Sequence, residues 1–537
     1  MTNNALQKKT SKPNIVSSNT TVDSIKLITG RQAKELVIGL CGPVGAGFKT
    51  IRSNLQLKLF ELGYDVKHIQ VSQLMKEIEK IPEPQSGYDR YIALQDLGDK
   101  LRLEFSPQIL AEAITCQITK IKEELKESQG LDKNERFTGK VAYIVDQLKN
   151  PAEVELLRLI YQNNFYLIGI LRSEQERKRN LRDEGISPKE VDELIHRDRR
   201  SEIKSGQQTE KTILDADFFL KNNQSHVTEI NKKIQRFLYL IHGVNGISPS
   251  VTEKGMFTAF SASLQSACLS RQVGAAILDI NGNVIATGRN DVPKFGGGLY
   301  SYEDGDKDYR CIHKGAKCYN DAQKNKIKKK ILSEINTEFE QILNDSTALS
   351  VEMKDTLKKI IDDKLANKVV NRIYKNTSVG SLIEYSRAIH AEMDAITTLA
   401  RTGDGTTKDK ILFTTTYPCH NCARHIVAAG IKKALYIEPY EKSLAIDLHD
   451  DAISNDVNCE NNKVVFEQFE GISPRRYQKF FFSTSDRKDR EGNSLNISTR
   501  YSNHVDIQFL DSYQDMEVRI AADFLKRISQ GGQINIV

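Results

Sequence analysis

The sequence predicts an α/β protein with more than one domain, and three observations lead to this prediction. The chain has 537 residues, more than one ordinary hydrophobic core organises. From about Ser24 to His242, strand-like apolar segments alternate with helix-like segments, which indicates a parallel sheet with crossover helices. A stretch rich in Gly, Ser and Pro, near Val244 to Gly255, then precedes a second series of strands and helices.

The first domain is expected to contain at least four buried strands. The segment IRSNLQLKLFELG, after the first of them, has its apolar residues at helical spacing. The expected strands are ELVIGLC (35–41), VKHIQVS (66–72), VAYIVDQ (141–147) and NFYLIGIL (164–171). Helices of the length found between them fit the crossovers of a parallel sheet.

A glycine-rich loop, GPVGAGFKT, follows the first strand. Loops of this kind bind phosphate because backbone N–H groups and a helix N-terminus surround the anion, while a lysine reaches the terminal phosphates. Gly42, Gly45 and Gly47 supply the turn. The loop and its flanking elements predict a P-loop NTPase- or kinase-like parallel sheet for the first domain.

The lysine position of this loop is disturbed. Counted from Gly42, Phe48 takes the place of the lysine, Lys49 takes that of the usual hydroxyl residue, and Thr50 is a displaced hydroxyl. Counted back from Lys49 and Thr50, the bulky Phe48 stands where the last glycine belongs. Both alignments depart from the pattern, and the first is slightly preferred. In that alignment Lys49 points about 100° away from the expected direction.

Two further features bear on this site. Asp146 ends an apolar strand and is the expected partner for Mg²⁺. The arginine-rich segment from Arg172 to Arg200 resembles the lid of nucleoside-monophosphate kinases, and a solvated helical surface is the equal alternative. We expect binding of ATP, GTP or another nucleotide with Mg²⁺ for regulation, or a purely structural role, in preference to phosphoryl transfer.

The second domain shows a different order of elements. A helix over 256–270 precedes a hairpin over 273–288 that turns at Asn281-Gly282. The lysine-rich segment from about Asp321 to Lys375 has helical periodicity and is interpreted as a solvated helical insertion. The expected elements beyond it are a helix at 386–400, a strand at 411–417, a helix at 419–430 and a strand at 433–439.

Two fragments of this domain carry the chemistry, His390-Ala391-Glu392 and Pro418-Cys419-His420-Asn421-Cys422. Zinc prefers thiolate and imidazole ligands, and a catalytic zinc keeps one position open for water. His390, Cys419 and Cys422 provide three ligands. Glu392 lies two residues after the histidine and can serve the water without binding the metal. The H-x-E and P-C-x-x-C patterns together are the signature of zinc nucleobase deaminases.

The fragments LSRQVGAAI, VIATGRNDVP, HAEMDAI and PCHNCARHIVAAGI resemble the deoxycytidylate deaminase family, a branch of the cytidine deaminase fold. The stretch YIEPYEKSLAIDLH and the fusion to a P-loop domain look like the two-domain bacterial antiphage deoxycytidine-nucleotide deaminases. The resemblance implies that His390, Cys419 and Cys422 bind zinc and that Glu392 carries protons.

The resemblance also implies roles for substrate-binding residues and for the whole protein. Asn290 would contact the deoxyribose and Arg271 would help to hold phosphate, while His449 is a candidate for the pocket. Such proteins convert dCTP or dCMP to the uracil nucleotide and drain the dCTP pool during phage replication. They form homo-oligomers, and an enzyme of this kind needs an inhibitory RNA or protein regulator in a healthy cell.

A second cysteine cluster, Cys311, His313 and Cys318, lies in a hydrophilic loop ahead of the insertion. Some deoxycytidylate deaminases use an additional structural zinc near the substrate. These three residues are the candidate ligands for a second metal.

The composition narrows the alternatives. Charged residues make up 28% of the chain and the net charge is +6, which suits anionic small molecules but is too weak and dispersed to predict a nucleic-acid surface. No stretch has the apolar length of a membrane span. The polar N-terminus lacks the apolar core of a secretion signal, and the cysteine spacing does not indicate secreted disulfides. We expect a cytoplasmic protein with no membrane partner.

Three rival functions remain at this point. An editor of cytosine or adenine in tRNA or single-stranded DNA would want a basic, aromatic-lined groove, and the deaminase segment shows none beyond the lysines of the insertion. A nucleotide-sensing P-loop protein with a secondary deaminase domain, or a nucleotide kinase, is disfavoured by the altered loop. The expected organisation is a disordered leader (1–23), a P-loop kinase-like domain (24–243), a cytidine deaminase-like αβα domain (255–485) with the insertion (about 321–375), and a C-terminal extension (486–537).

Overall fold

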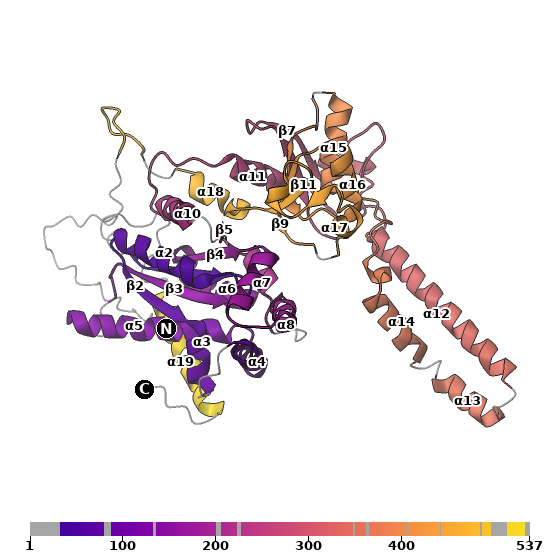
Figure 1. The fold of residues 1–537 in the computed structure, drawn as a ribbon, viewed down its shortest axis with the longest axis horizontal. Helices are drawn as coiled ribbons and strands as arrows, with labels where there is room; N and C mark the ends of the chain where they lie inside the picture. The colour runs from indigo at the N-terminus through magenta and orange to yellow at the C-terminus, as the bar shows by residue number, and fades with distance from the viewer. Residues whose placement is uncertain are drawn as a thin grey trace, which may run out of the picture.

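The computed structural model describes most of the chain. The described residues are 33–79, 87–132, 136–199, 206–222, 227–346, 350–360, 365–403, 405–440, 442–483, 486–495 and 513–531. The expected leader, 1–23, lies outside them. The chain forms a mixed α/β structure with two six-stranded sheets, each rich in parallel pairs (Figure 1).

The first sheet has the strand order β12-β5-β4-β1-β3-β2. Its five parallel strands are β1 (Leu36–Cys41), β2 (Asp65–Gln70), β3 (Val141–Leu148), β4 (Phe165–Leu171) and β5 (Phe218–Lys221). The four expected strands are therefore present. The second ends earlier than expected, because the chain turns into a helix at Val71.

Both faces of this sheet are covered, as the apolar strands require. On β1, Leu36, Ile38 and Leu40 join one hydrophobic cluster with helices α2 and α10, whereas Val37 and Cys41 join another with α3 to α6. The helices of this domain are α2 (Phe48–Glu61), α3 (Val71–Glu79), α4 (Tyr88–Glu104), α5 (Ile109–Gln129), α6 (Pro151–Tyr161), α7 (Glu174–Asp183), α8 (Pro188–Arg199), α9 (Thr209–Leu214) and α10 (Val227–Ile241).

The second sheet has the order β10-β11-β9-β8-β6-β7, with β6 antiparallel to both β7 and β8. Its strands are β6 (Gly274–Leu278), β7 (Val284–Arg289), β8 (Ile411–Thr416), β9 (Lys433–Glu438), β10 (Ile453–Ser454) and β11 (Val464–Gln468). The helices that accompany it are α11 (Val251–Ser263), α15 (Ala391–Thr402), α16 (His420–Ala428) and α17 (Ala445–Leu448). The predicted hairpin is the pair β6 and β7.

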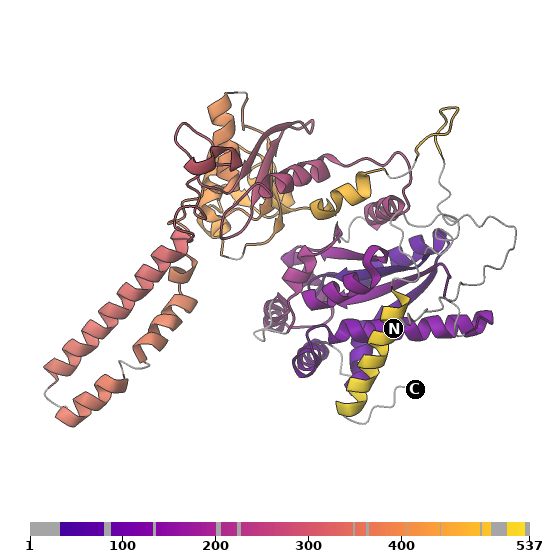
Figure 2. The same cartoon turned by 180° about the vertical axis from the view of Figure 1, so that it is seen from behind.

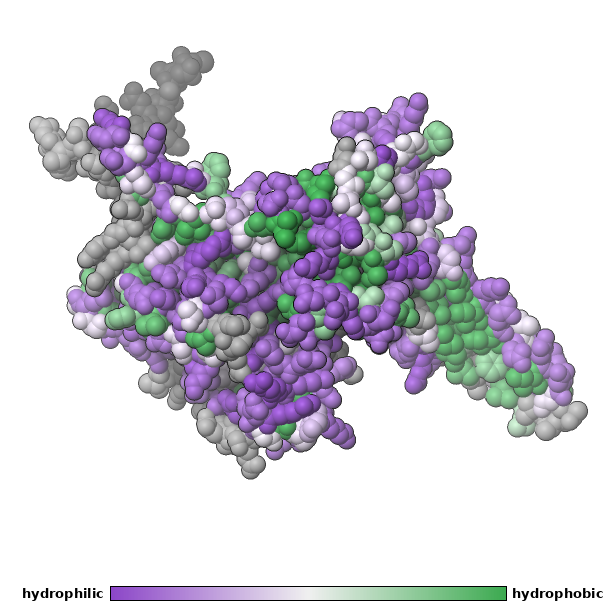
Figure 3. Space-filling view, turned by 45° about the horizontal axis from the view of Figure 1, so that its top comes forward, coloured by the Kyte–Doolittle hydropathy of each residue, from purple (hydrophilic) through white to green (hydrophobic). Residues whose placement is uncertain are grey.

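The helical insertion is an arm that extends away from the second sheet (Figures 1 and 2). It consists of α12 (Tyr319–Asp345), α13 (Val351–Ile360) and α14 (Ala366–Asn376), and α12 packs against α14. Apolar residues gather along one side of this arm (Figure 3). Exposed members include Ile342, Val351 and Met353.

The chain returns to the first domain after the second sheet is complete. β12 (Gly471–Ile472) pairs antiparallel with β5, so a strand from beyond the second domain forms one edge of the first sheet. α18 (Tyr477–Phe481) follows, and α19 (Gln514–Gly531) packs against α5. The two sheets are therefore joined by shared structure as well as by the segment between α10 and α11.

Helix α19 is fixed by buried polar contacts. Lys122 Nζ lies 2.7 Å from Glu517 Oε2 and 3.1 Å from Glu35 Oε2, and each of these three side chains is at most 5% exposed. The Tyr513 hydroxyl donates to Glu35. Because a buried lysine needs its carboxylates, these contacts tie the C-terminal helix to the start of β1.

None of the helices that the structure describes combines the length and the apolar character needed to cross a membrane.

Candidate active site

The starts of two helices meet at the end of β8 and carry the predicted metal ligands. α15 begins after His390, and α16 begins after Cys419, which β8 delivers through Tyr417 and Pro418. α15 lies unusually close to β7. A Cβ atom at Gly288 would come within 2.2 Å of the Ala391 carbonyl oxygen. Glycine at this position therefore allows the first turn of α15 to pack directly on the sheet.

The three predicted ligands form a compact cluster. His390 Nδ1 lies 3.3 Å from Cys419 Sγ and 3.3 Å from Cys422 Sγ, and all three ligand atoms lie within 4.8 Å of one another. Tetrahedral zinc, with the usual Zn–N and Zn–S bond lengths, separates a nitrogen and a sulfur ligand by about 3.6 Å. No other group of three such residues is found in the described part of the chain. The cluster fits a zinc ion.

The charge of this cluster also suits a metal cation. The Cys422 thiol and His390 lower the pKa of Cys419 to about 4, and the Cys422 backbone N–H donates to its Sγ. The same interaction, together with burial, raises the pKa of Cys422. Contact with Cys419 raises the pKa of His390. A divalent cation would release the protons that remain on these groups, because thiolate and neutral imidazole are the forms that bind a metal.

Glu392 lies beside the cluster without belonging to it. Its Oε2 is 3.5 Å from Cys422 Sγ, and the residue is 4% exposed. Burial raises the pKa of this carboxyl group above its usual value, which makes it better able to hold a proton near neutral pH. When bound, Zn²⁺ supplies an acidified water. The role of Glu392 as the carrier of the protons of such a water stays a prediction.

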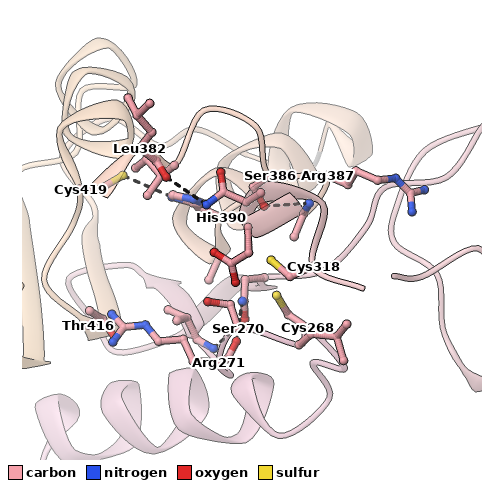
Figure 4. Close-up of a pocket in the computed structure, with 18 of the residues that line it drawn as sticks. Cys268, Ser270, Arg271, Cys318, Leu382, Ser386, Arg387, His390, Thr416 and Cys419 are labelled. Carbon is pink, nitrogen blue, oxygen red and sulfur yellow. Dashed lines mark hydrogen bonds between the residues drawn. The ribbon is translucent and has the colours of Figure 1, made fainter. Parts of the chain in front are cut away.

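These residues open onto a cavity of about 380 Å³, within the range typical of small-molecule sites. Figure 4 shows His390 and Cys419 on one side of it and Arg271 on the other. Arg271 Nη1 contacts Glu438 Oε1 at 2.9 Å, and its guanidinium group lies 5.8 Å from the centre of the Tyr440 ring. Arg271 is therefore held at the cavity by two residues at and just after the end of β9.

Asn290 lines the same cavity, but its amide is used to shape the loop that bears Arg271. Its Oδ1 accepts the Val273 backbone N–H at 2.7 Å, and its Nδ2 donates to the Arg271 carbonyl oxygen at 2.7 Å. At 8% exposure, the side chain has limited room for a direct sugar contact. Its role at the deoxyribose stays a prediction.

Two other predicted features are placed differently from the zinc cluster. His449, which follows α17, is not among the described residues that line the cavity. Cys311 and Cys318 line it, whereas His313 contacts Asp308 at 3.3 Å with a side chain 55% exposed. The structure does not bring the latter three together as a ligand group. The second metal stays a prediction that this geometry does not favour.

The glycine loop of the first domain lies between β1 and α2. Gly45 and Gly47 have φ of 77° and 80°, so both need the conformational freedom of glycine. Phe48 is only 9% exposed and joins the hydrophobic cluster beneath α2, whereas Lys49 and Thr50 are exposed. The Phe48 side chain, which the first alignment puts at the lysine position, therefore packs into the core. Phosphate binding by this loop stays a prediction.

Asp146 lies at the end of β3, as predicted, but its Oδ2 is engaged by protein cations. Arg52 Nη1 and His68 Nε2 each lie 3.0 Å from it. The Arg52 guanidinium group therefore neutralises the negative charge of the Asp146 carboxylate without Mg²⁺.

A basic side chain that the sequence did not single out lies at the loop instead. Arg172, at the end of β4, is 8% exposed, and its Nη1 lies 3.0 Å from the position that a Cβ atom at Gly47 would occupy. Its buried Nε and Nη1 atoms have no hydrogen-bond partner among the described residues. Asn222, from the end of β5, donates to the carbonyl oxygens of Ala46 and Gly47.

The residues that complete the deaminase-side cavity were also missed by sequence reasoning. They come from four separate segments, so no local spacing connects them. The four segments share no composition that would have marked them. Members of this set are Cys268, Tyr319, Lys324, Leu382 and Tyr440.

Comparison with known proteins gives the class of this site. Residues 249–438 match the family model described as the cytidine and deoxycytidylate deaminase zinc-binding region. This range includes His390, Glu392, Cys419 and Cys422, and it supports the predicted deoxycytidylate deaminase family for this part of the chain.

Short stretches of the chain also match individual proteins. The chain is 42% identical over 55 residues to a deoxycytidylate deaminase of Enterobacteria phage T2, a match that covers 10% of this chain and 29% of the phage protein. It is 43% identical over 56 residues to ComE operon protein 2 of Bacillus subtilis, covering 10% and 29%. The chain thus spans less than a third of the curated relatives that it matches.

A solved structure is also similar, the dCMP deaminase of cyanophage S-TIM5 in its apo form. It is 17% identical, and the match covers 41% of this chain and 99% of that one, with a TM-score of 0.21.

Proposed function

We propose that this protein is a zinc-dependent hydrolase that deaminates deoxycytidine nucleotides, dCTP, dCMP or both, to the corresponding uracil nucleotides. The observation that carries the proposal is the His390, Cys419 and Cys422 cluster with the buried Glu392 beside it. This combination is the one zinc nucleobase deaminases use. The relatives named as deoxycytidylate deaminases support the choice of substrate.

In this proposal the chain's residues manage protons and orientation. Water provides the oxygen that replaces the amino group of the cytosine ring, and ammonia leaves. Glu392 takes a proton from the attacking water and gives it to the ring nitrogen. It then takes the second proton of the same oxygen and gives it to the amine, which leaves as ammonia; both transfers are general acid–base catalysis. Tyr417 and Leu382, in the cavity wall, supply apolar surface against which a base packs.

The wider role follows from the resemblance of the motifs. The protein would act in the cytoplasm as a homo-oligomer, drain dCTP during phage replication, and be restrained beforehand by an inhibitory RNA or protein regulator. Editing of tRNA or single-stranded DNA is the alternative for the same metal site.

One assay tests the reaction. Purified protein is offered dCMP, dCTP, deoxycytidine and a cytosine-containing oligonucleotide, and ammonia and uracil products are measured. Nucleotide turnover that is abolished by Glu392→Ala supports the proposal. Turnover of the oligonucleotide alone would overturn it.

We also propose that the glycine loop binds the phosphates of a nucleotide, with Arg172 in place of the missing lysine. The observation that favours it is the buried Arg172 guanidinium group at the start of α2, whose Nε and Nη1 atoms have no hydrogen-bond partner among the described residues. No described side chain caps this helix, and a helix N-terminus favours an anion. The loop also follows the central strand β1, where parallel sheets place ligands.

Calorimetric titration with ATP, GTP and pyrophosphate tests this second proposal. Arg172→Gln is expected to weaken binding at least tenfold, while the exposed Arg179→Gln on α7 is the matched control. Equal affinity in both variants, or binding by neither the wild type nor the control, would contradict it.

A further inference from the structure

The base of the helical insertion forms part of the wall of the active-site cavity. α12 begins directly after Cys318, and its first two turns contribute four residues to the cavity that Glu392 lines. These residues are Tyr319, Asn320, Asp321 and Lys324. The base of the arm therefore belongs to the cavity, whereas the rest of the arm extends away from the second sheet.

This wall is fixed from two sides. Asn320 Nδ2 donates to the Leu382 carbonyl oxygen at 3.0 Å, so α12 is attached to the segment that leads to α15. Arg387 lies 5.1 Å from the centre of the Tyr319 ring and donates to the Tyr309 carbonyl oxygen at 3.0 Å. Figure 4 shows its side chain directed away from His390. Arg387 thus holds the wall and does not fill the cavity.

Lys324 brings a positive charge to this wall. Its side chain is only 14% exposed, and its Nζ lies 2.8 Å from Asp321 Oδ1, whose side chain is 60% exposed. An ion pair one helical turn apart with such an exposed carboxylate contributes little to stability. A largely buried lysine held by so weak a partner keeps the capacity to bind a stronger anion.

Lys324 and Arg271 line the same cavity from different elements, Lys324 from α12 and Arg271 from the segment before β6. The Tyr440 ring also lines the cavity, and its centre lies 5.8 Å from the Arg271 guanidinium group. Arg387 and Lys442 add two further positive charges to the lining. The uncharged cytosine and deoxyribose do not require these cations, whereas a phosphate group does.

We infer that Lys324 of the helical insertion binds the 5′-phosphate chain of the substrate, opposite Arg271. This inference rests on the proposed function and gives the insertion a role in it: the arm selects nucleotides over the free nucleoside. Asp321 holds the ammonium group until the phosphate takes over the contact. Lysine suits this exchange because its charge is compact and its stem is flexible.

Steady-state kinetics with dCMP and with deoxycytidine test the inference. Lys324→Met keeps the length of the side chain and removes its charge. It is expected to raise the KM for dCMP at least tenfold, with kcat within about twofold, and to leave the KM for deoxycytidine unchanged. The matched control is Lys330→Met, an exposed lysine on the same helix outside the cavity. Equal KM values for dCMP in both variants would overturn the inference.

A second measurement separates this test from that of the reaction itself. The affinity for dCMP is measured by calorimetry in protein that carries Glu392→Gln, with and without Lys324→Met, and in a Lys324→Arg variant that restores charge. Weaker dCMP binding that Lys324→Arg partly rescues supports the inference, even if the wild type deaminates none of the substrates offered. Binding that does not depend on the charge at position 324 would contradict it.

Discussion

The metal-binding motif and the glycine loop both lie at helix N-termini. The metal-binding motif consists of side chains, whereas the glycine loop consists of backbone. At the starts of α15 and α16, the side chains of His390, Cys419 and Cys422 are themselves the site, and the structure brings them within 4.8 Å of one another. At the start of α2, the glycine backbone forms the loop. The adjacent Lys49 and Thr50 are exposed. A motif whose side chains bind the ligand predicts the residues of its site. A motif that only shapes the backbone does not predict which charged side chain completes the site.

The strongest contrast is expected from Glu392→Gln. This change removes the group that transfers protons but keeps its size, so kcat should fall by about 10³ to 10⁴-fold. The zinc content should stay at the wild-type level, because Glu392 is outside the ligand cluster. The rate of product formation gives kcat, and metal analysis gives the zinc content. Retained turnover would remove the proton-transfer role of Glu392.

The next effect concerns the close approach of α15 to the sheet. Gly288→Ala places a Cβ atom 2.2 Å from the Ala391 carbonyl oxygen, so α15 must move away together with His390 at its start. We expect a loss of about 2–3 kcal/mol in the free energy of unfolding together with weaker zinc retention. Gly403→Ala, at the other end of the same helix in open space, should cost less and leave zinc bound. Equal zinc loss in both variants would show that general destabilisation is the cause.

A smaller effect, in the first domain only, depends on pH. His242 is 2% exposed, between the Tyr64 hydroxyl and the Leu238 carbonyl oxygen. Burial lowers its pKa to about 4, whereas the unfolded chain takes up this proton near pH 6.5. The folded state is therefore fully favoured above pH 6.5 and loses about 2 kcal/mol by pH 5 from this residue.

Urea unfolding at pH 7.5 and at pH 5 measures this dependence. His242→Gln should lower stability at pH 7.5 but reduce the loss on acidification by about 2 kcal/mol. An unchanged pH dependence in the variant would assign the acid sensitivity to other groups.

The smallest effect should come from the lysine of the glycine loop itself. Because Lys49 is exposed, Lys49→Ala is expected to change nucleotide affinity by less than about twofold, against at least tenfold for Arg172→Gln. Calorimetric titration of both variants with the same nucleotide gives the comparison. A larger effect at Lys49 would restore the second alignment of the motif.

Local sequence patterns could predict much of the fold. The strands β1, β3 and β4 are short apolar runs, and the hairpin β6–β7 has its Asn281-Gly282 turn, so each was recognised within a residue or two. β12 and α19 were not recognised, because their stability comes from distant partners. Gly471 pairs with Phe219, and Glu517 contacts Lys122. Contacts between residues so far apart in the sequence leave no mark in the local hydrophobic periodicity.

The same distinction applies to the candidate site. The spacing of Cys419 and Cys422 on one helix, with His390 and Glu392 at the start of another, was sufficient to predict the metal cluster. The cavity wall was not predictable in this way. Lys324 is one of many lysines in a lysine-rich segment, and the sequence does not distinguish it from the others. It lines the cavity because α12 is attached there through the hydrogen bond from Asn320 to the Leu382 carbonyl oxygen.

The attachment of α19 to α5 has a consequence for synthesis on the ribosome. The partners of the Lys122 ammonium include Glu517, and roughly 290 residues separate β5 from Tyr513. At typical translation rates, these take about 15–60 s to make. During that time the face of α5 that α19 will cover stays open, and the second sheet is complete before the first domain has all of its parts. The domain of the first sheet, whose strands are made first, is thus completed after the second sheet.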